Sequence, residues 1–174
     1  MIAFNRVLIP TDFTPLATHA LRYAIDLVKA YRTELHILHV VSPAKDIPIS
    51  TDGGGAVVAI GSGLTPMEPI EAVVARKHRE LEEYVAEFSP PRLSLETKIA
   101  VRAGVPWREI VSYSEEAAID LIVMGSHAKG VMRRILLGST SKSVLEHVAR
   151  PVLLVPIAAL QGESRAQPTE TVPP

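Results

Sequence analysis

The sequence predicts a single-domain α/β protein in which a five-stranded parallel sheet carries helices on both faces. Three observations predict it. Short apolar runs alternate with helical periodicity along the chain, 174 residues suit one ordinary core, and 47% hydrophobic with 21% charged residues is typical of a globular protein. Strands that alternate with helices pair in parallel, and such sheets bind ligands beyond the carboxyl ends of their strands.

The amino-terminal part contains two expected strands and one helix. Val7–Ile9 is an apolar run of the kind found in buried parallel strands, and Glu34–Val41 is a second run, rich in Leu, Ile and Val. Between them, apolar residues recur at helical spacing from Leu16 to Tyr31, with Asp12 or Thr14 as the expected cap.

Residues 42–66 are rich in Gly, Pro and Ser and lack hydrophobic periodicity. The segment is too long for a plain connection in a compact domain, so we expect a mobile loop or lid. The later expected elements are a helix from Ile70 to Phe88, a strand from Leu95 to Val101, a helix from Pro106 to Ala118, a buried strand from Asp120 to Met124, a helix from about Ser139 to Ala149 and a strand from Pro151 to Pro156. We expect one domain over 1–157 and a disordered tail over 158–174.

Composition excludes several classes of function. The net charge is -1, so nothing favours a nucleic-acid partner. The chain has no cysteine, which excludes disulfides and zinc–thiolate sites, and the histidines lack the spacing of metal ligands. No signal peptide opens the chain and no apolar run approaches the roughly 20 residues that cross a bilayer, so we expect a cytoplasmic protein with no membrane partner.

The segment from Met124 to Thr140 has the composition of a phosphate-binding turn. It begins at the end of the strongest strand and finishes at a helix start. Glycines let main-chain N–H groups approach an anion, and a helix start adds unpaired N–H groups and a positive dipole end. Lys129 and nearby arginines add positive charge. The alternative is an ordinary strand–helix connection in which Ser139 is a plain helix cap.

This segment and its flanking strands resemble the universal stress protein family. The nucleotide-binding branch has the pattern Gly-x2-Gly-x9-Gly-[Ser/Thr], which Gly125, Gly138 and Ser139 match. Ala128 replaces the second glycine, and Gly130 follows two residues later. If that position requires positive φ, alanine costs about 1 kcal/mol. The resemblance continues through the first strand and its Asp turn, the first helix, and the second and last strands, and so covers nearly the whole chain.

The resemblance implies a Rossmann-like fold, of the adenine nucleotide alpha hydrolase type, with strand order 3-2-1-4-5. It also implies an adenine nucleotide, ATP, with or without Mg²⁺, at the turns after the first and fourth strands. Asp12 and Val40 would lie against adenine and ribose, with Met124 beside the base. The full set of implied binding residues is Pro10, Thr11, Asp12, Val40, Met124, Gly125, Ser126, His127, Ala128, Lys129, Gly130, Gly138, Ser139 and Thr140.

Three functions remain open at this point. The first is a nucleotide-binding stress-response regulator or sensor that forms a homodimer through its last strand, Pro151–Val155, as the family commonly does. The second is a slow ATPase, although no Walker motif occurs and Asp12 is the one carboxylate placed near the phosphates. The third is a protein-interaction module with a vestigial nucleotide site, which Ala128 allows.

Overall fold

The computed structural model describes residues 4–42, 58–60, 63–65, 68–88, 96–129, 134–136 and 138–156; for 58–60, 63–65, 127–129 and 134–136 it describes the main chain alone. Most of the loop expected at 42–66, and the tail expected at 158–174, lie outside these residues. Inside that loop, two strands of three residues, β3 (Val58–Ile60) and β4 (Gly63–Thr65), pair in antiparallel fashion.

Five parallel strands form the centre of the fold, in the order β5-β2-β1-β6-β8. This confirms the expected order 3-2-1-4-5. The strands are β1 (Arg6–Thr11), β2 (Glu34–Val41), β5 (Thr97–Ala103), β6 (Leu121–Lys129) and β8 (Val152–Pro156). Because β1 lies between β2 and β6, the chain reverses its direction of strand addition beside β1. The carboxyl ends of β1 and β6 are therefore adjacent.

The structure differs from expectation beyond Met124. The fourth strand, β6, does not end there but continues to Lys129, and its outer part pairs antiparallel with a further strand, β7 (Arg134–Leu136). The expected phosphate-binding turn is thus partly a β-ladder. The ladder satisfies main-chain N–H and C=O groups that a plain loop would leave to water.

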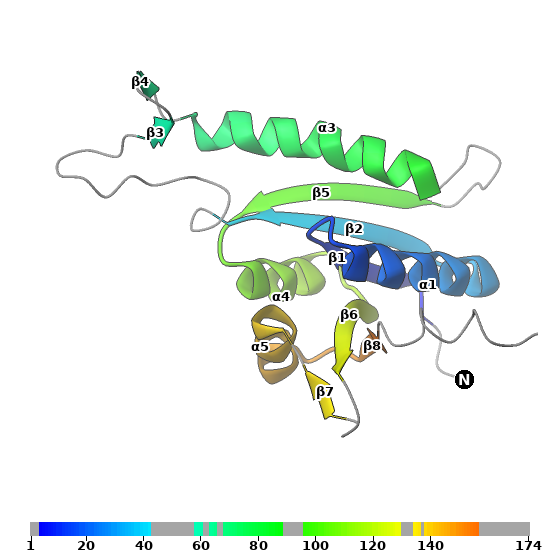
Figure 1. Ribbon diagram of the computed structural model, residues 1–174. Helices are drawn as coiled ribbons and strands as arrows, with labels where there is room; N and C mark the ends of the chain where they lie inside the picture. Colours follow the sequence, from blue (N-terminus) through cyan, green and yellow to red (C-terminus); the bar gives the residue numbers. More distant parts are fainter. Residues whose placement is uncertain are drawn as a thin grey trace, which may run out of the picture.

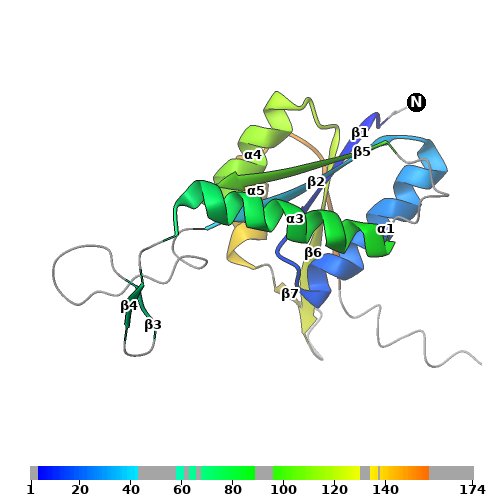
Figure 2. The same ribbon diagram turned by 90° about the horizontal axis from the view of Figure 1, so that it is seen from above.

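Two helices cover each face of the sheet (Figures 1 and 2). The helices are α1 (Pro15–Tyr31), α3 (Ile70–Phe88), α4 (Pro106–Glu116) and α5 (Ser139–His147). One buried cluster joins α1 and α3 to the sheet through residues such as Leu21 and Leu81. A second joins α4 and α5 to the opposite face through Ile110 and Val144. No helix among the described residues is both long and apolar enough to cross a bilayer.

Local sequence explains both ends of α1. Thr14 is the N-cap, and its side chain accepts a hydrogen bond from the main-chain N–H of Ala17. Pro15 occupies the first turn, where its missing N–H costs nothing. Arg32 ends the helix in a left-handed conformation, with φ of 53°, and its N–H bonds to the carbonyl of Val28. Of the two expected caps, Thr14 is the one that bonds the helix amide.

Charged side chains gather at the amino ends of β1, β2 and β5, where Arg6, Glu34, His36 and Lys98 form what we call the amino-end cluster. Glu34 contacts Arg6 (Nε to Oε2, 3.3 Å), His36 (Nε2 to Oε1, 3.2 Å) and Lys98. The hydrogen bond from Lys98 is the largest cause of a lowered pKa at Glu34. Burial lowers the pKa of His36, whose Nδ1 lies 2.8 Å from the hydroxyl of Tyr113.

Candidate functional site

A cleft of about 770 Å³ opens at the carboxyl ends of β1, β2 and β6, against the start of α5. This lies in the range of about 300–1,000 Å³ that is usual for small-molecule sites. Most of the sequence-predicted site residues line it: Pro10, Thr11, Asp12, Val40, Met124, Gly125, Gly138, Ser139 and Thr140. The cleft also lies where the strand order reverses, the position expected for a ligand in such a sheet.

One wall of the cleft is apolar. Leu38 and Met124 are nearly inaccessible to solvent and belong, with Ile110, to the core on the α4–α5 face. Val40 is partly buried and packs against the same cluster. All four side chains line the cleft. This wall therefore suits an apolar part of a ligand, because contact would remove apolar surface of both the ligand and the wall from water.

The turn after β1 carries Asp12, which lines the cleft. Its Oδ1 accepts hydrogen bonds from the main-chain N (3.2 Å) and the hydroxyl (2.6 Å) of Thr14, which joins the turn to the cap of α1. Phe13 follows with φ of 61°, a strained conformation for a residue with a side chain. Its N–H donates to Oγ1 of Thr11 at 3.1 Å, which helps to hold the turn.

Gly125 is required by packing. A Cβ at this position would lie 2.8 Å from the main-chain oxygen of Leu16 and 2.6 Å from its Cγ. The first turn of α1 therefore lies directly over β6, and only glycine lets it come so close. The sequence predicted that this glycine starts an anion-binding turn. It does line the cleft, but the close approach of Leu16 also explains why a glycine is needed at this position.

Gly138 has the opposite surroundings. It is the N-cap of α5, with φ of -62° and ψ of 158°, and no side chain makes a capping hydrogen bond there. A Cβ at Gly138 would meet no atom of the described residues within 4 Å. The first N–H groups of a helix have no partner inside the helix, so they need a side chain, water or a ligand. Ser139 and Thr140 open this helix and line the cleft, as predicted from the sequence.

The other predicted residues lie further along β6. Ser126 is buried, with 2% exposure, and its Oγ has no hydrogen-bond partner in the part of the chain that the structure describes. His127, Ala128 and Lys129 pair with β7, and only their main chain is described. Because Ala128 lies in an extended ladder opposite Ile135, its backbone does not need positive φ, and alanine is not strained there. Gly130 lies outside the described residues.

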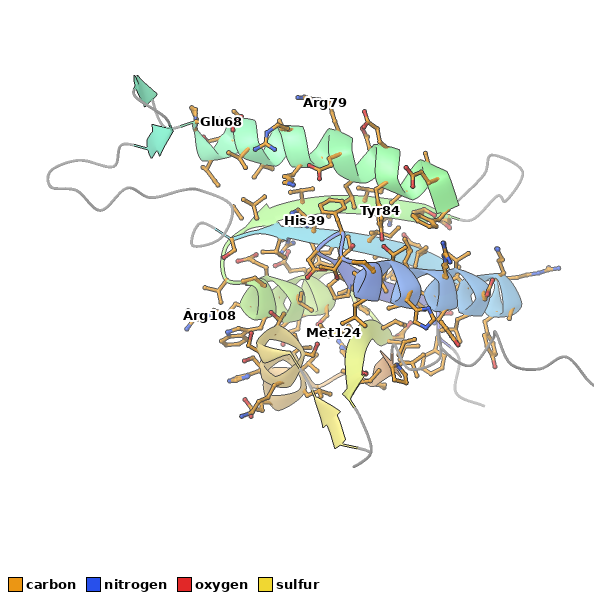
Figure 3. The ribbon with its side chains drawn as sticks, in the orientation of Figure 1. His39, Glu68, Arg79, Tyr84, Arg108 and Met124 are labelled. Atoms are coloured by element: carbon orange, nitrogen blue, oxygen red, sulfur yellow. The ribbon has the colours of Figure 1, made fainter. Side chains whose placement is uncertain are left out.

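Among the lining residues that sequence reasoning missed, two have basic side chains, His39 and Lys77. His39 is 5% exposed; its Nδ1 lies 2.8 Å from the carbonyl oxygen of Thr11, and its Nε2 finds no hydrogen-bond partner among the described residues. Alternation along β2 places His39 and Val40 on opposite faces of the sheet, His39 on the α1–α3 side. There the rings of His39 and Tyr84, both labelled in Figure 3, each contact the ring of Phe13. Its place next to Val40 was an available signal. Lys77 lies in the middle of α3, and no local pattern points to it.

Three ionisable side chains belong to the described lining of the cleft: Asp12, His39 and Lys77. Among the described residues of the cleft, Asp12 is the sole carboxylate, and Thr14 already occupies one of its oxygens. The described residues contain no group of three His, Cys, Asp or Glu side chains placed to hold a metal ion. An apolar wall, an aspartate and an uncapped helix start match a base, a sugar and an anion in turn.

A family model decides the relationship of the chain. The model of the universal stress protein family matches residues 3–156. The chain belongs to the universal stress protein family. Two universal stress proteins of Methanocaldococcus jannaschii, MJ0531 and MJ0577, are each 30% identical to it; the matches cover 87% and 88% of this chain, and 82% and 96% of the relatives.

Solved structures of universal stress proteins agree with the fold. The structure of MJ0577 superposes with a TM-score of 0.53 at 26% identity, covering 89% of this chain and 97% of that one. A universal stress protein of Archaeoglobus fulgidus, solved in complex with dAMP, gives a TM-score of 0.54 at 17% identity and covers 88% and 98% of the two chains. At that identity the likeness speaks for the fold alone.

Proposed function

We propose that this universal stress protein binds an adenine nucleotide, ATP, in the cleft, and acts as a cytoplasmic stress-response regulator or sensor. The observation that carries the proposal is the start of α5. Its N-cap is Gly138, which lines the cleft; among the described residues no side chain caps this helix, and none has an atom within 4 Å of a Cβ placed on that glycine. A helix start in this condition favours an anion through unpaired N–H groups and the helix dipole.

The rest of the cleft supports a nucleotide rather than a bare anion. Adenine would pack on the apolar wall of Val40 and Met124, and the ribose hydroxyls would donate to Asp12. Gly138, Ser139 and Thr140, which line the cleft, would hold phosphate oxygens. Mg²⁺, where present, would arrive with the phosphates. The dAMP complex of a protein with this fold is consistent with an adenine nucleotide.

We favour regulation over catalysis because Asp12 is the sole carboxylate of the described lining and Thr14 already occupies one of its oxygens. The other ionisable side chains of that lining are His39 and Lys77. Bound nucleotide would alter the surface around the cleft, and a ligand that prefers one conformation shifts the population toward it. Turnover of about 1 s⁻¹ or faster, abolished by Asp12→Ala, would instead place the protein among ordinary ATPases.

We also propose a homodimer through the last strand. Among the described residues, β8 pairs with β6 on one side and with no strand on the other. Leu153 on β8 and Leu145 on α5 are each 39% exposed. An apolar strand at a sheet edge is an aggregation hazard unless something covers it, and a second copy of the same strand would do so. Light scattering tests this: a strict monomer at micromolar concentration would contradict it.

Calorimetry on protein stripped of ligand tests the main proposal. ATP with Mg²⁺ is titrated into the wild type and into the double variant Gly138→Asp/Ser139→Ala, in which a carboxylate faces the phosphates. We expect saturable binding by the wild type and none by the variant. Absence of binding by the wild type would leave the third reading, an interaction module whose nucleotide site is vestigial.

A further inference from the structure

The cleft reaches past the start of α5 to a lysine on another helix. Lys77 lies in α3, and its side chain is only 18% exposed. Of the described side chains that line the cleft, it is the sole lysine or arginine. A lysine is seldom so far withdrawn from water without a charged or polar partner, so its partners show what the position is for.

Among the described residues, an acidic side chain and an aromatic ring contact the ammonium group of Lys77. Its Nζ lies 2.8 Å from Oε2 of Glu80, one turn further along α3, and 5.1 Å from the ring centroid of Phe13. The Glu80 side chain is 44% exposed, and an ion pair so open to water contributes little to stability. Phe13 fixes the other side, because it belongs to the turn that also carries Asp12. The ammonium group is thus held at the cleft by a weak ion pair with Glu80, which a ligand of higher negative charge can replace.

The charge of the described lining is unbalanced for a polyphosphate. A helix start offers about half a positive charge, and Asp12 offsets it. A nucleoside triphosphate carries several negative charges, so the described lining without Lys77 would leave most of them unmatched. AMP carries fewer phosphate charges than ATP, so its binding depends less on a further cation.

We propose that Lys77 binds the phosphate chain of the nucleotide and makes the site prefer di- and triphosphates to a monophosphate. The inference rests on the proposed nucleotide function and deepens it. Lys77 gives up its contact with Glu80 to the outer phosphates and stays over the ring of Phe13. Because Lys77 belongs to α3, the same contact ties this helix to the charge state of the ligand.

The test compares ATP, ADP and AMP on the wild type and on Lys77→Gln by calorimetry, with thermal unfolding as a check of folding. We expect Lys77→Gln to bind ATP and ADP about tenfold or more weakly, the usual loss for one charge-assisted hydrogen bond, and to bind AMP within about twofold of wild type. Lys77→Arg, which keeps the charge, should retain most of the ATP affinity. Equal loss for all three nucleotides, or no loss for any, would overturn the assignment.

Two controls separate the explanations. Arg76→Gln removes a positive charge from the neighbouring position of α3, where the side chain is 48% exposed and does not line the cleft; it should leave every affinity unchanged. Glu80→Gln leaves Lys77 without its ion-pair partner and should bind ATP about twofold more tightly. If Glu80→Gln instead weakens ATP binding as much as Lys77→Gln, the ion pair and not the cation supports the site, and the proposal is wrong.

The wild-type titration distinguishes a failure of the proposed nucleotide binding from a failure of the role of Lys77. If the wild type binds none of the three nucleotides, the proposed function itself fails. If it binds ATP and Lys77→Gln binds ATP equally well, nucleotide binding stands and the role of Lys77 fails alone.

Discussion

The two ends of the same parallel sheet use polar groups in opposite ways. At the amino end, Glu34 contacts three basic side chains, and Asp120 accepts hydrogen bonds from the main-chain N–H groups of Asn5 (2.7 Å) and Arg6 (3.0 Å). At the carboxyl end, α5 starts on an uncapped glycine. Polar groups that are already paired hold the fold together, whereas groups left without partners around a cleft are available to a ligand.

The largest expected effect separates binding from stability at the carboxyl end. Gly138→Asp should weaken ATP binding by about two orders of magnitude, because a fixed carboxylate would face the phosphates at close range. It should leave the unfolding temperature unchanged or slightly higher, since Asp is a better N-cap than Gly. Calorimetry and thermal unfolding measure the two effects. Gly138→Asn is the matched control, with the same shape and no charge, and should lose much less affinity.

Gly125→Ala should show that one residue of the cleft, like the paired groups at the amino end of the sheet, is needed for stability. The new Cβ would meet the main-chain oxygen of Leu16 at 2.8 Å, so α1 or β6 must shift. We expect a loss of about 1–3 kcal/mol in the free energy of unfolding, the usual range for overpacking. Urea unfolding measures it. Gly138→Ala is the control, because its Cβ meets nothing, and a loss as large there would contradict this account.

The amino-end cluster should make stability depend on pH. Glu34 has a pKa below its ordinary 4.5 in the folded chain, chiefly through its hydrogen bond with Lys98, so its contribution is complete above pH 4.5 and is lost as the pH falls through the lowered value. His36, whose pKa burial lowers below 6.5, favours the folded state above pH 6.5 and increasingly less below it. The free energy of unfolding should therefore decline from pH 7 toward pH 3.

Glu34→Gln tests the source of that decline. The variant should be less stable than the wild type at pH 7 and should lose less stability on acidification, because one of the titrating groups is gone. Its ATP affinity at pH 7 should equal that of the wild type, since the cluster lies at the other end of the sheet. An unchanged slope of stability against pH between 5 and 3 would exclude Glu34 as its source.

The smallest expected effect concerns Thr14, which both stabilises α1 and contacts Asp12 at the cleft. Thr14→Ala removes the cap of α1 and the hydroxyl that donates to Asp12. Loss of an N-cap costs about 1 kcal/mol. ATP affinity should change by no more than a few-fold, because the Asp12 carboxylate remains. Thermal unfolding and calorimetry on the same preparation measure both, and Thr14→Ser, which keeps the hydroxyl, is the matched control.

Most elements were predictable from local sequence, and the exceptions have physical reasons. The strand Glu34–Val41 was predicted with its observed bounds, and the helix at Ser139 with its observed start, because apolar runs and glycine stops are local signals. The continuation of β6 was missed because Gly125 reads as a turn residue. The reason for this glycine is the approach of Leu16, from more than a hundred residues away in the chain.

The candidate site divides in the same way. Asp12, Gly138 and Ser139 follow strands or begin a helix, so their place at the cleft could be read from the sequence and the family resemblance. Lys77 could not, because only the packing of α3 beside the turn of Phe13 brings it there. Side chains that a long-range contact delivers to a site leave no mark in their own neighbourhood of the sequence.

The turn at Phe13 has a consequence for engineering. A left-handed residue with a Cβ costs about 1–2 kcal/mol, and the ring of Phe13 offsets this through His39 (centroids 4.6 Å apart) and Tyr84 (5.3 Å). The backbone thus favours Gly or Asn at position 13, while the aromatic neighbours favour Phe. A library randomised there and selected only for heat resistance would have to satisfy two incompatible demands, so thermostabilisation of this protein should begin elsewhere.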